Sequence, residues 1–192
     1  MKKLRTLVLM HEDLIPPDTP PAGVDLASVD WKTEFDVVTT LRGMGHEVKP
    51  LGVRNDLGVI RRAIDDWKPH IAFNLLEEFD GISVYDQNVV SYLELLRIPY
   101  TGCNPRGLML AHDKSLSKKI FSYHRIPIPE FTVFPIGRTV KRPKRLAFPL
   151  IVKSASEEAS LGISQASIVD DDEKLRERVA FIHNSVGTSA LV

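Results

Sequence analysis

The chain has 192 residues, of which 43% are hydrophobic and 26% are charged, a balance typical of a folded protein rather than a disordered one. Twenty-five Lys and Arg residues offset 25 Asp and Glu residues, so the net charge gives no reason to expect a nucleic-acid or membrane partner. The single cysteine, Cys103, excludes an intramolecular disulfide. No apolar run approaches the roughly 20 residues of a membrane helix, and we expect a cytoplasmic protein.

The first half of the sequence alternates apolar runs with segments of helical spacing. Strands are predicted at 4–10, 46–51, 70–76 and 98–101. Helices are predicted at 31–44, 56–67 and 85–96, with Asp30 and Asp56 as caps and Gly45 as a stop signal. The proline-rich segment 14–23 is expected to be an irregular loop. This alternation predicts an α/β fold with an open parallel, Rossmann-like sheet, which binds ligands beyond the carboxyl ends of its strands.

Near Gly102 the pattern changes from alternation to one basic helix followed by several short strands. The helix is predicted at 113–123, strands at 130–134, 149–153 and 163–168, and a last helix after the cap Asp170. We therefore expect a Rossmann-like domain at 1–102 and a small α+β subdomain at 103–192. The final apolar run, Ala190 to Val192, is short for a strand, which indicates a sequence cut from a longer protein or a short edge strand at a true C-terminus.

Two lysines are candidates for binding an anion. Lys153 ends a strongly apolar strand and precedes a loop of small and polar residues, whose backbone amides could approach phosphate oxygens. The alternative is a hairpin with a solvated lysine at its edge. Lys114 lies in the first turn of the basic helix, where a cation is mildly unfavourable for the helix dipole and an anionic ligand would explain it. The alternative is a solvated helix face shared with Lys118 and Lys119.

Three segments together resemble the D-alanine:D-alanine ligase family of ATP-grasp enzymes. LLRIPYTGCNPRGLMLAHDKSLSKKIF (95–121) and IPIPEFTVF (126–134) are similar to the family's GIPYxG, DKxxxK and hydrophobic-strand pattern. FPLIVKSASEEASLGIS (148–164) is similar to its FPxxVKPxxxGSSxG segment. The resemblance covers most of the chain, and the paired segments are more specific together than either is alone.

The resemblance implies an ATP-dependent ligase that joins a small-molecule carboxylate to an amine through an acyl phosphate. It implies that Lys114 and Lys153 contact ATP phosphates and that the following loop folds over them as a lid, through Glu157, Ser160 and Gly162. Magnesium is implied as a second cofactor, with ligands expected beyond Val192. Catalytic residues are not assigned, a homodimer is implied by the family, and the isolated chain is expected to lack turnover.

Departures from the family pattern concern the loops around the first substrate. The sequence reads NLLEEFDGISVYDQ where the family has a histidine-glycine pair and GEDG, and HEDLIPPDTPPAG replaces a glycine-rich turn. Glu12, Glu77 and Asp80 are therefore candidate substrate-binding residues, and an amino acid or small carboxylate other than D-alanine is expected. In the lid, Ser154, Glu158 and Ala159 replace family residues. A non-catalytic Rossmann-like module that binds a metabolite or nucleotide is the alternative function.

Overall fold

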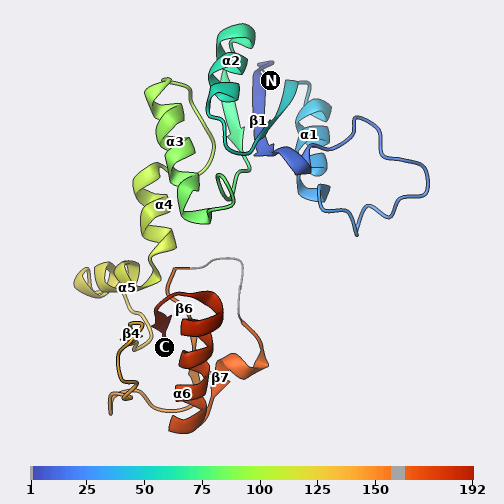
Figure 1. The fold of residues 1–192 in the computed structure, drawn as a ribbon. Helices are drawn as coiled ribbons and strands as arrows, with labels where there is room; N and C mark the ends of the chain where they lie inside the picture. The colour runs from blue at the N-terminus through green and yellow to red at the C-terminus, as the bar shows by residue number, and fades with distance from the viewer. Residues whose placement is uncertain (1, 157–162) are drawn as a thin grey trace. The chain divides into compact units, whose positions relative to one another are not determined.

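A computed structural model of the chain describes residues 2–156 and 163–192. The chain divides into two compact units, Met1–Leu108 and Met109–Val192, and the division falls within α4 (Pro105–His112) (Figure 1). Each unit is described by itself below. The functional domain boundary between residues 102 and 103 stays a prediction.

Unit 1 is built on a parallel sheet, as the sequence predicts. In chain order its elements are β1 (Arg5–His11), η1 (Glu12–Leu14), α1 (Lys32–Gly43), β2 (Glu47–Val53), α2 (Gly58–Trp67), β3 (Ile71–Asn74), η2 (Ser83–Tyr85) and α3 (Asp86–Leu95). The strand order is β2-β1-β3, and both pairings are parallel. The predicted fourth strand is reduced to a single bridge between Ala72 and Tyr100, so that prediction is wrong in extent.

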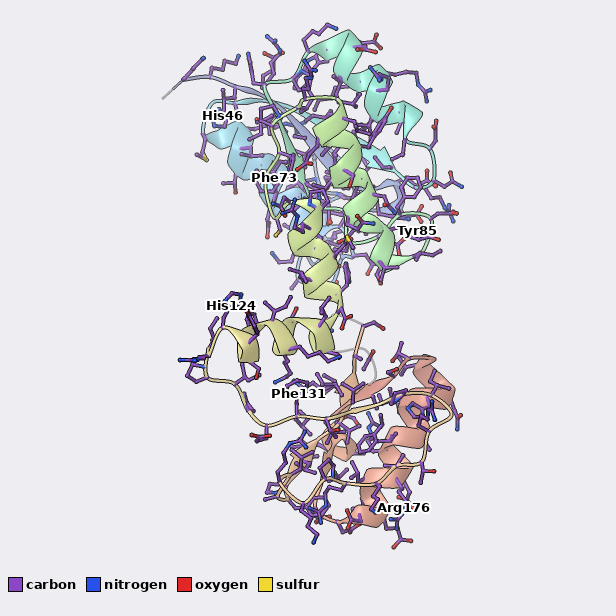
Figure 2. The ribbon with its side chains drawn as sticks, turned by 90° about the vertical axis from the view of Figure 1, so that its left-hand side faces the viewer. His46, Phe73, Tyr85, His124, Phe131 and Arg176 are labelled. Atoms are coloured by element: carbon purple, nitrogen blue, oxygen red, sulfur yellow. The ribbon has the colours of Figure 1, made fainter. Side chains whose placement is uncertain are left out.

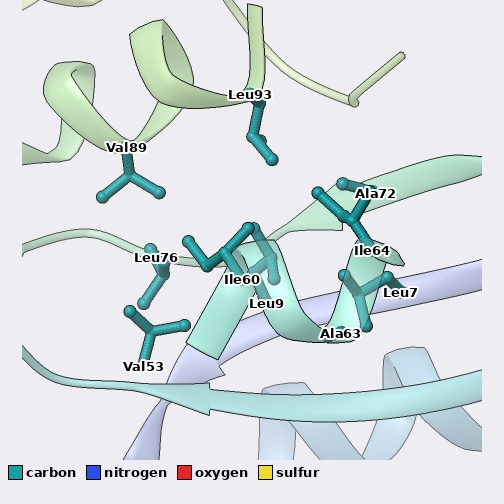
Figure 3. Close-up of a cluster of buried hydrophobic side chains, with 10 residues drawn as sticks. All are labelled: Leu7, Leu9, Val53, Ile60, Ala63, Ile64, Ala72, Leu76, Val89 and Leu93. Atoms are coloured by element: carbon teal, nitrogen blue, oxygen red, sulfur yellow. The ribbon is translucent and has the colours of Figure 1, made fainter. Parts of the chain in front are cut away.

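The central strand β1 is buried on both faces, and its alternating side chains supply two cores. Leu7 and Leu9 are fully buried in a cluster with residues of α2 and α3 (Figure 3). Val8 and Met10 are fully buried with Val38 of α1. Because successive strand residues point to opposite faces, helices must cover the sheet on both sides. Burial of each such side chain stabilises the fold by about 1.5–3 kcal/mol.

The helix signals of unit 1 are partly confirmed. The Asp56 carboxylate accepts a hydrogen bond of 2.7 Å from the Gly58 N–H, but Leu57 occupies the N-cap position of α2 without a side-chain hydrogen bond, so the predicted cap at Asp56 is displaced by one residue. Gly45 has φ 85°, as expected for a residue that ends a helix. The predicted cap at Asp30 is wrong: Trp31 occupies the N-cap position without a side-chain hydrogen bond. A backbone turn replaces the cap, since the Lys32 N–H donates to the Val29 carbonyl at 3.4 Å.

Unit 2 contains short antiparallel strands packed on one helix. Its elements after α4 are α5 (Lys114–Tyr123), β4 (Val133–Phe134), β5 (Leu150–Ile151), β6 (Lys153–Ser154), η3 (Gln165–Ser167), β7 (Ile168–Val169), α6 (Asp172–Phe181), the π-helix η4 (Ile182–Val186) and β8 (Ala190–Leu191). The sheets have the orders β4-β8-β6 and β5-β7. Their shared core includes Phe134, Val152, Leu175 and Ile182.

Several sequence predictions for unit 2 need correction. The single strand predicted at 149–153 is two strands, because Leu150 and Ile151 pair with β7 whereas Lys153 and Ser154 pair with β8. Half of the strand predicted at 163–168 is instead the 3-10 helix η3, and only Ile168 belongs to a strand, β7.

The ends of unit 2 also differ from the sequence predictions. The cap of α6 is Asp171 rather than Asp170, because the Asp171 carboxylate accepts from the Lys174 N–H at 2.8 Å. The final apolar run forms β8, which is the middle strand of its sheet rather than an edge strand. β4 pairs with one side of β8 and β6 pairs with the other, all within unit 2.

Candidate functional site

A cavity of about 430 Å³ lies within unit 2. One wall is a single face of α5, formed by Lys114, Ser117, Lys118 and Phe121 at the spacing i, i+3, i+4 and i+7. Residues from three other segments complete the lining: Ile128, Pro129, Glu130, Phe131, Ile151, Lys153, Leu191 and Val192, with Ala111 of α4. The cavity is therefore apolar for most of its surface and carries three lysines.

Backbone hydrogen bonds hold Lys114 and Lys153 at this cavity. The Asp113 carboxylate caps α5 by accepting from the Leu116 N–H at 2.8 Å. The Lys114 N–H donates to the Ala155 carbonyl at 3.0 Å, which ties the first turn of α5 to the residue that follows β6. Lys153 is fixed in β6 by its pairing with Leu191 of β8. Two lysines from distant parts of the sequence thus line the same space.

A second group of contacts positions the aromatic side of the cavity. The Lys118 ammonium lies 5.3 Å from the centroid of the Phe131 ring, close enough for a cation–π interaction. Figure 2 shows Phe131 beside α5. The Arg145 guanidinium donates to the Phe131 carbonyl at 2.8 Å and to the Glu130 carboxylate at 2.9 Å. Arg145 therefore balances the charge of the carboxylate in the lining.

These features favour a ligand that is anionic at one end and apolar at the other. Lysine ammonium groups attract phosphate or carboxylate oxygens, more strongly in a concave, partly apolar space than in bulk water. Phe121, Phe131 and Ile151 offer surfaces on which a flat, apolar group can pack. A nucleoside triphosphate has both parts.

The carboxyl ends of the three strands of unit 1 carry a different, mixed-charge cluster. The Arg54 guanidinium donates to the Glu12 carboxylate at 2.8 Å, and the Asp80 N–H donates to the Arg54 carbonyl at 2.8 Å. The hydrogen bond and charge of Glu12, with the charges of Asp13 and Asp80, raise the pKa of Arg54 above its ordinary value. We call Glu12, Asp13, Arg54 and Asp80 the edge cluster.

Known proteins were compared with the chain. No family model matches. The D-alanine–D-alanine ligase of Desulforudis audaxviator is 32% identical over 161 residues, which is 81% of this chain and 49% of that protein. The ligase of Syntrophotalea carbinolica is 32% identical over 162 residues, 82% of this chain and 49% of that protein. The chain is a homologue of the D-alanine–D-alanine ligases. It spans about half the length of the curated relatives it matches.

Solved structures confirm the ATP-grasp ligase fold for this ligase homologue. The D-alanine–D-alanine ligase of Bacillus anthracis matches with a TM-score of 0.72 at 23% identity, covering 98% of this chain and 56% of that one. The same enzyme complexed with ATP matches with a TM-score of 0.66, covering 98% and 57%. The L-amino acid ligase of Bacillus licheniformis matches with a TM-score of 0.60 at 14% identity, covering 100% and 46%. The predicted fold class and the predicted resemblance are thereby confirmed.

The structure brings some of the predicted site residues of the ligase homologue together. Lys114 and Lys153 line one cavity. In unit 1, Glu12 and Asp80 both contact Arg54, whereas Glu77 is exposed and makes no hydrogen bond or ion pair with the edge cluster among the described residues. The three lid candidates, Glu157, Ser160 and Gly162, lie outside the described residues. The roles of all of these residues stay predictions.

Sequence reasoning missed three residues that the geometry singles out. Lys118 was named only in the alternative of a solvated helix face, but it lines the cavity; its position four residues after Lys114 was the available signal. Phe131 lies in a segment predicted only as a strand. Arg54 directly follows β2, so the rule that ligands bind beyond strand ends could have identified it.

Two further features concern metal ligands and membrane-spanning helices. Within residues 2–156 and 163–192, no group of three or more His, Cys, Asp or Glu side chains is arranged to hold a metal ion. No magnesium ligand is therefore assigned, and magnesium stays a prediction. Over the same residues, the helices are too short or too polar to cross a membrane.

Proposed function

We propose that the cavity of unit 2 binds ATP and that the chain supplies this site to an ATP-dependent carboxylate–amine ligase. The observation that carries the proposal is the convergence of Lys114 and Lys153 on one cavity that also has apolar walls. The homology to D-alanine–D-alanine ligases supports an ATP-dependent ligase. The residues present fit ATP, since the lysines match the triphosphate and the apolar walls match the base.

The proposed reaction has two steps. A substrate carboxylate oxygen attacks the terminal phosphorus of ATP, so that the bond to the leaving ADP oxygen breaks and an acyl phosphate forms. The substrate amine then attacks the acyl carbon, and the bond from that carbon to the phosphate oxygen breaks. Phosphate leaves with the electron pair of this bond, and the nitrogen loses a proton to give the amide. Bound ATP supplies the phosphoryl group.

In this proposal the chain contributes electrostatic stabilisation and positioning. Negative charge accumulates on the oxygens between the second and third phosphorus atoms during transfer, and fixed ammonium groups stabilise it. Lys114 is held by the Ala155 carbonyl and Lys153 by β8, so neither backbone has to reorganise as the charge develops. The apolar walls exclude water, which would hydrolyse an acyl phosphate.

The test is ATP binding by the 192-residue chain, measured by isothermal titration calorimetry. Lys114→Met and Lys153→Met should each weaken ATP binding about tenfold or more, because a charge-assisted hydrogen bond contributes about 1.5–3 kcal/mol. Lys119→Met is the matched control: the same charge is removed from α5, but Lys119 is exposed and does not line the cavity. Indifference of ATP binding to both variants would contradict the proposal and favour the metabolite-binding module.

The first substrate is proposed to bind near the edge cluster of unit 1, as an amino acid or small carboxylate other than D-alanine. Glu12 and Asp80 offer charge for a substrate ammonium, and Arg54 offers charge for a carboxylate. The expectation that these 192 residues alone lack turnover stays a prediction, which a magnesium-dependent ATP hydrolysis assay tests.

A further inference from the structure

Among the three lysines that line the cavity, Lys118 has its ammonium beside an aromatic ring. It lies one helical turn after Lys114 on the same face of α5. Its Nζ atom is 5.3 Å from the centroid of the Phe131 ring. An ammonium at this distance is attracted by the negative face of the ring. The Lys118 charge thus lies against an aromatic side chain of the cavity lining.

Phe131 is contacted both at its backbone and at its ring. Its backbone carbonyl accepts a hydrogen bond of 2.8 Å from Arg145, whose guanidinium also binds the neighbouring Glu130 carboxylate at 2.9 Å. Its ring face carries the Lys118 ammonium. The ring cannot turn about its side-chain torsions without losing the Lys118 contact. Phe131 therefore lines the cavity with an anchored backbone and with a ring orientation that the Lys118 contact favours.

The polarity of α5 changes along the same face. Lys114, tied to the end of β6, marks the cationic end, and Phe121, two turns later, marks the apolar end. Lys118 lies between them. A ligand whose anionic part contacts Lys114 and Lys153 would place its apolar part toward Phe121 and Phe131.

We propose that Lys118 is a positioning residue that fixes the Phe131 ring as a wall for the nucleoside part of the ligand, and so determines selectivity for a nucleoside triphosphate over a bare polyphosphate. The proposal rests on the proposed ATP site. It assigns different tasks to neighbouring lysines: Lys114 and Lys153 attract the phosphates, and Lys118 acts through an aromatic side chain.

The experiment compares two probes, ATP and inorganic tripolyphosphate, in calorimetric titrations of the 192-residue chain. Lys118→Met should weaken ATP binding about fivefold, the equivalent of one cation–π interaction, and leave tripolyphosphate binding unchanged. Lys118→Arg should restore ATP binding, because a guanidinium also packs on an aromatic face. Lys114→Met should weaken the binding of both probes, and Lys119→Met that of neither.

A second variant changes the aromatic ring instead of the lysine. Phe131→Leu should reproduce the selective loss of ATP binding, and adding Lys118→Met to it should cause no further loss. Circular dichroism of each variant checks that the fold is retained, and Phe131→Leu and Lys118→Arg carry the test if Lys118→Met does not fold.

Each other outcome has a defined meaning. Equal weakening of both probes by Lys118→Met would make Lys118 a phosphate ligand and overturn the inference. No effect on either probe would overturn it as well and leave Lys118 a structural residue. Failure of the unmodified chain to bind either probe would overturn the proposed ATP site itself, together with this inference.

Discussion

The cavity of unit 2 and the edge cluster of unit 1 use charge in different ways. The cavity combines three lysines with apolar walls, and Glu130, the one carboxylate of its lining among residues 2–156 and 163–192, is paired with Arg145. The edge cluster contains both signs of charge, paired with one another at the surface, with side-chain exposures of 55% for Arg54 and 44% for Glu12. Exposed ion pairs contribute little to stability or affinity, whereas cations beside apolar walls select an anion. The cavity is therefore the more specific of the two sites.

The largest expected effect comes from the hydrophobic cores beneath the two sites. Leu175 is 1% exposed in unit 2, and Leu9 is fully buried in unit 1. Replacing either leucine with alanine should lower the free energy of unfolding by about 2–5 kcal/mol, because a cavity remains where the side chain was removed. Urea unfolding followed by circular dichroism measures this loss.

Amide hydrogen exchange of the two core variants tests whether the two cores unfold independently. Leu175→Ala should speed amide exchange in β6 and β8 and weaken ATP binding, since Val152 beside Lys153 shares its core. Leu9→Ala removes the same atoms from unit 1 and should speed exchange in β2 and β3. Faster exchange in both units from either variant would show that the two cores unfold as one, against this prediction.

A smaller effect is expected from Gly52, which lies against the edge cluster. A Cβ atom at this position would be 2.9 Å from the Cα of Glu12 and 2.6 Å from the Cδ1 of Ile15. Because Glu12 would have to move with its backbone, Gly52→Ala should destabilise the chain by about 1–3 kcal/mol and disturb the Arg54–Glu12 pair. The unfolding midpoint in urea measures the change.

Gly43→Ala provides the control for this substitution. Gly43 ends α1, and an added Cβ there meets no atom within 4 Å. Alanine should be neutral or slightly stabilising, since it restricts the unfolded chain and favours the helix. If both alanine variants had the same stability, the close approach of β2 to Glu12 would have no energetic consequence.

The sequence predicted best those features that depend on neighbouring residues. The apolar run of β1 and the turn at Gly45 are local patterns, and both are confirmed. The helix α4 was missed although its signals are local too: Pro105 opens it, and the Asn104 side chain accepts from the Gly107 N–H at 2.8 Å.

Features that depend on remote partners could not be predicted in the same way. The extended segment from Leu150 to Ser154 changes from one sheet to the other because its partners, Val169 and Leu191, belong to different strands far along the chain. Nothing within the segment itself indicates that change. Similarly, the contact of Lys118 with Phe131 depends on how α5 packs on a segment that follows it. The family motif, rather than local periodicity, brought Lys114 and Lys153 together before the structure did.

The smallest expected effect is at Tyr100, which belongs to neither the cavity nor the edge cluster. Its hydroxyl binds a proton with different affinity in the folded and the unfolded chain. Its hydroxyl donates a hydrogen bond of 2.7 Å to the Glu94 carboxylate. Burial, the Glu94 hydrogen bond and the charges of Glu94 and Cys103 raise the pKa of Tyr100 to about 12. A raised pKa means that the folded chain holds this proton more tightly than the unfolded chain does. The associated stability is therefore present below the ordinary tyrosine pKa of about 10 and is lost as the pH rises from there toward 12.

Absorbance titration of the tyrosines at alkaline pH tests this expectation. Tyr100 should ionise near pH 12, and Tyr100→Phe should remove that step. Glu94→Gln should move the step to lower pH, because the amide keeps a hydrogen-bond acceptor but removes the negative charge that opposes ionisation. A titration in which Tyr100 ionised near the ordinary tyrosine value of about 10 would show that water reaches the Glu94 hydrogen bond.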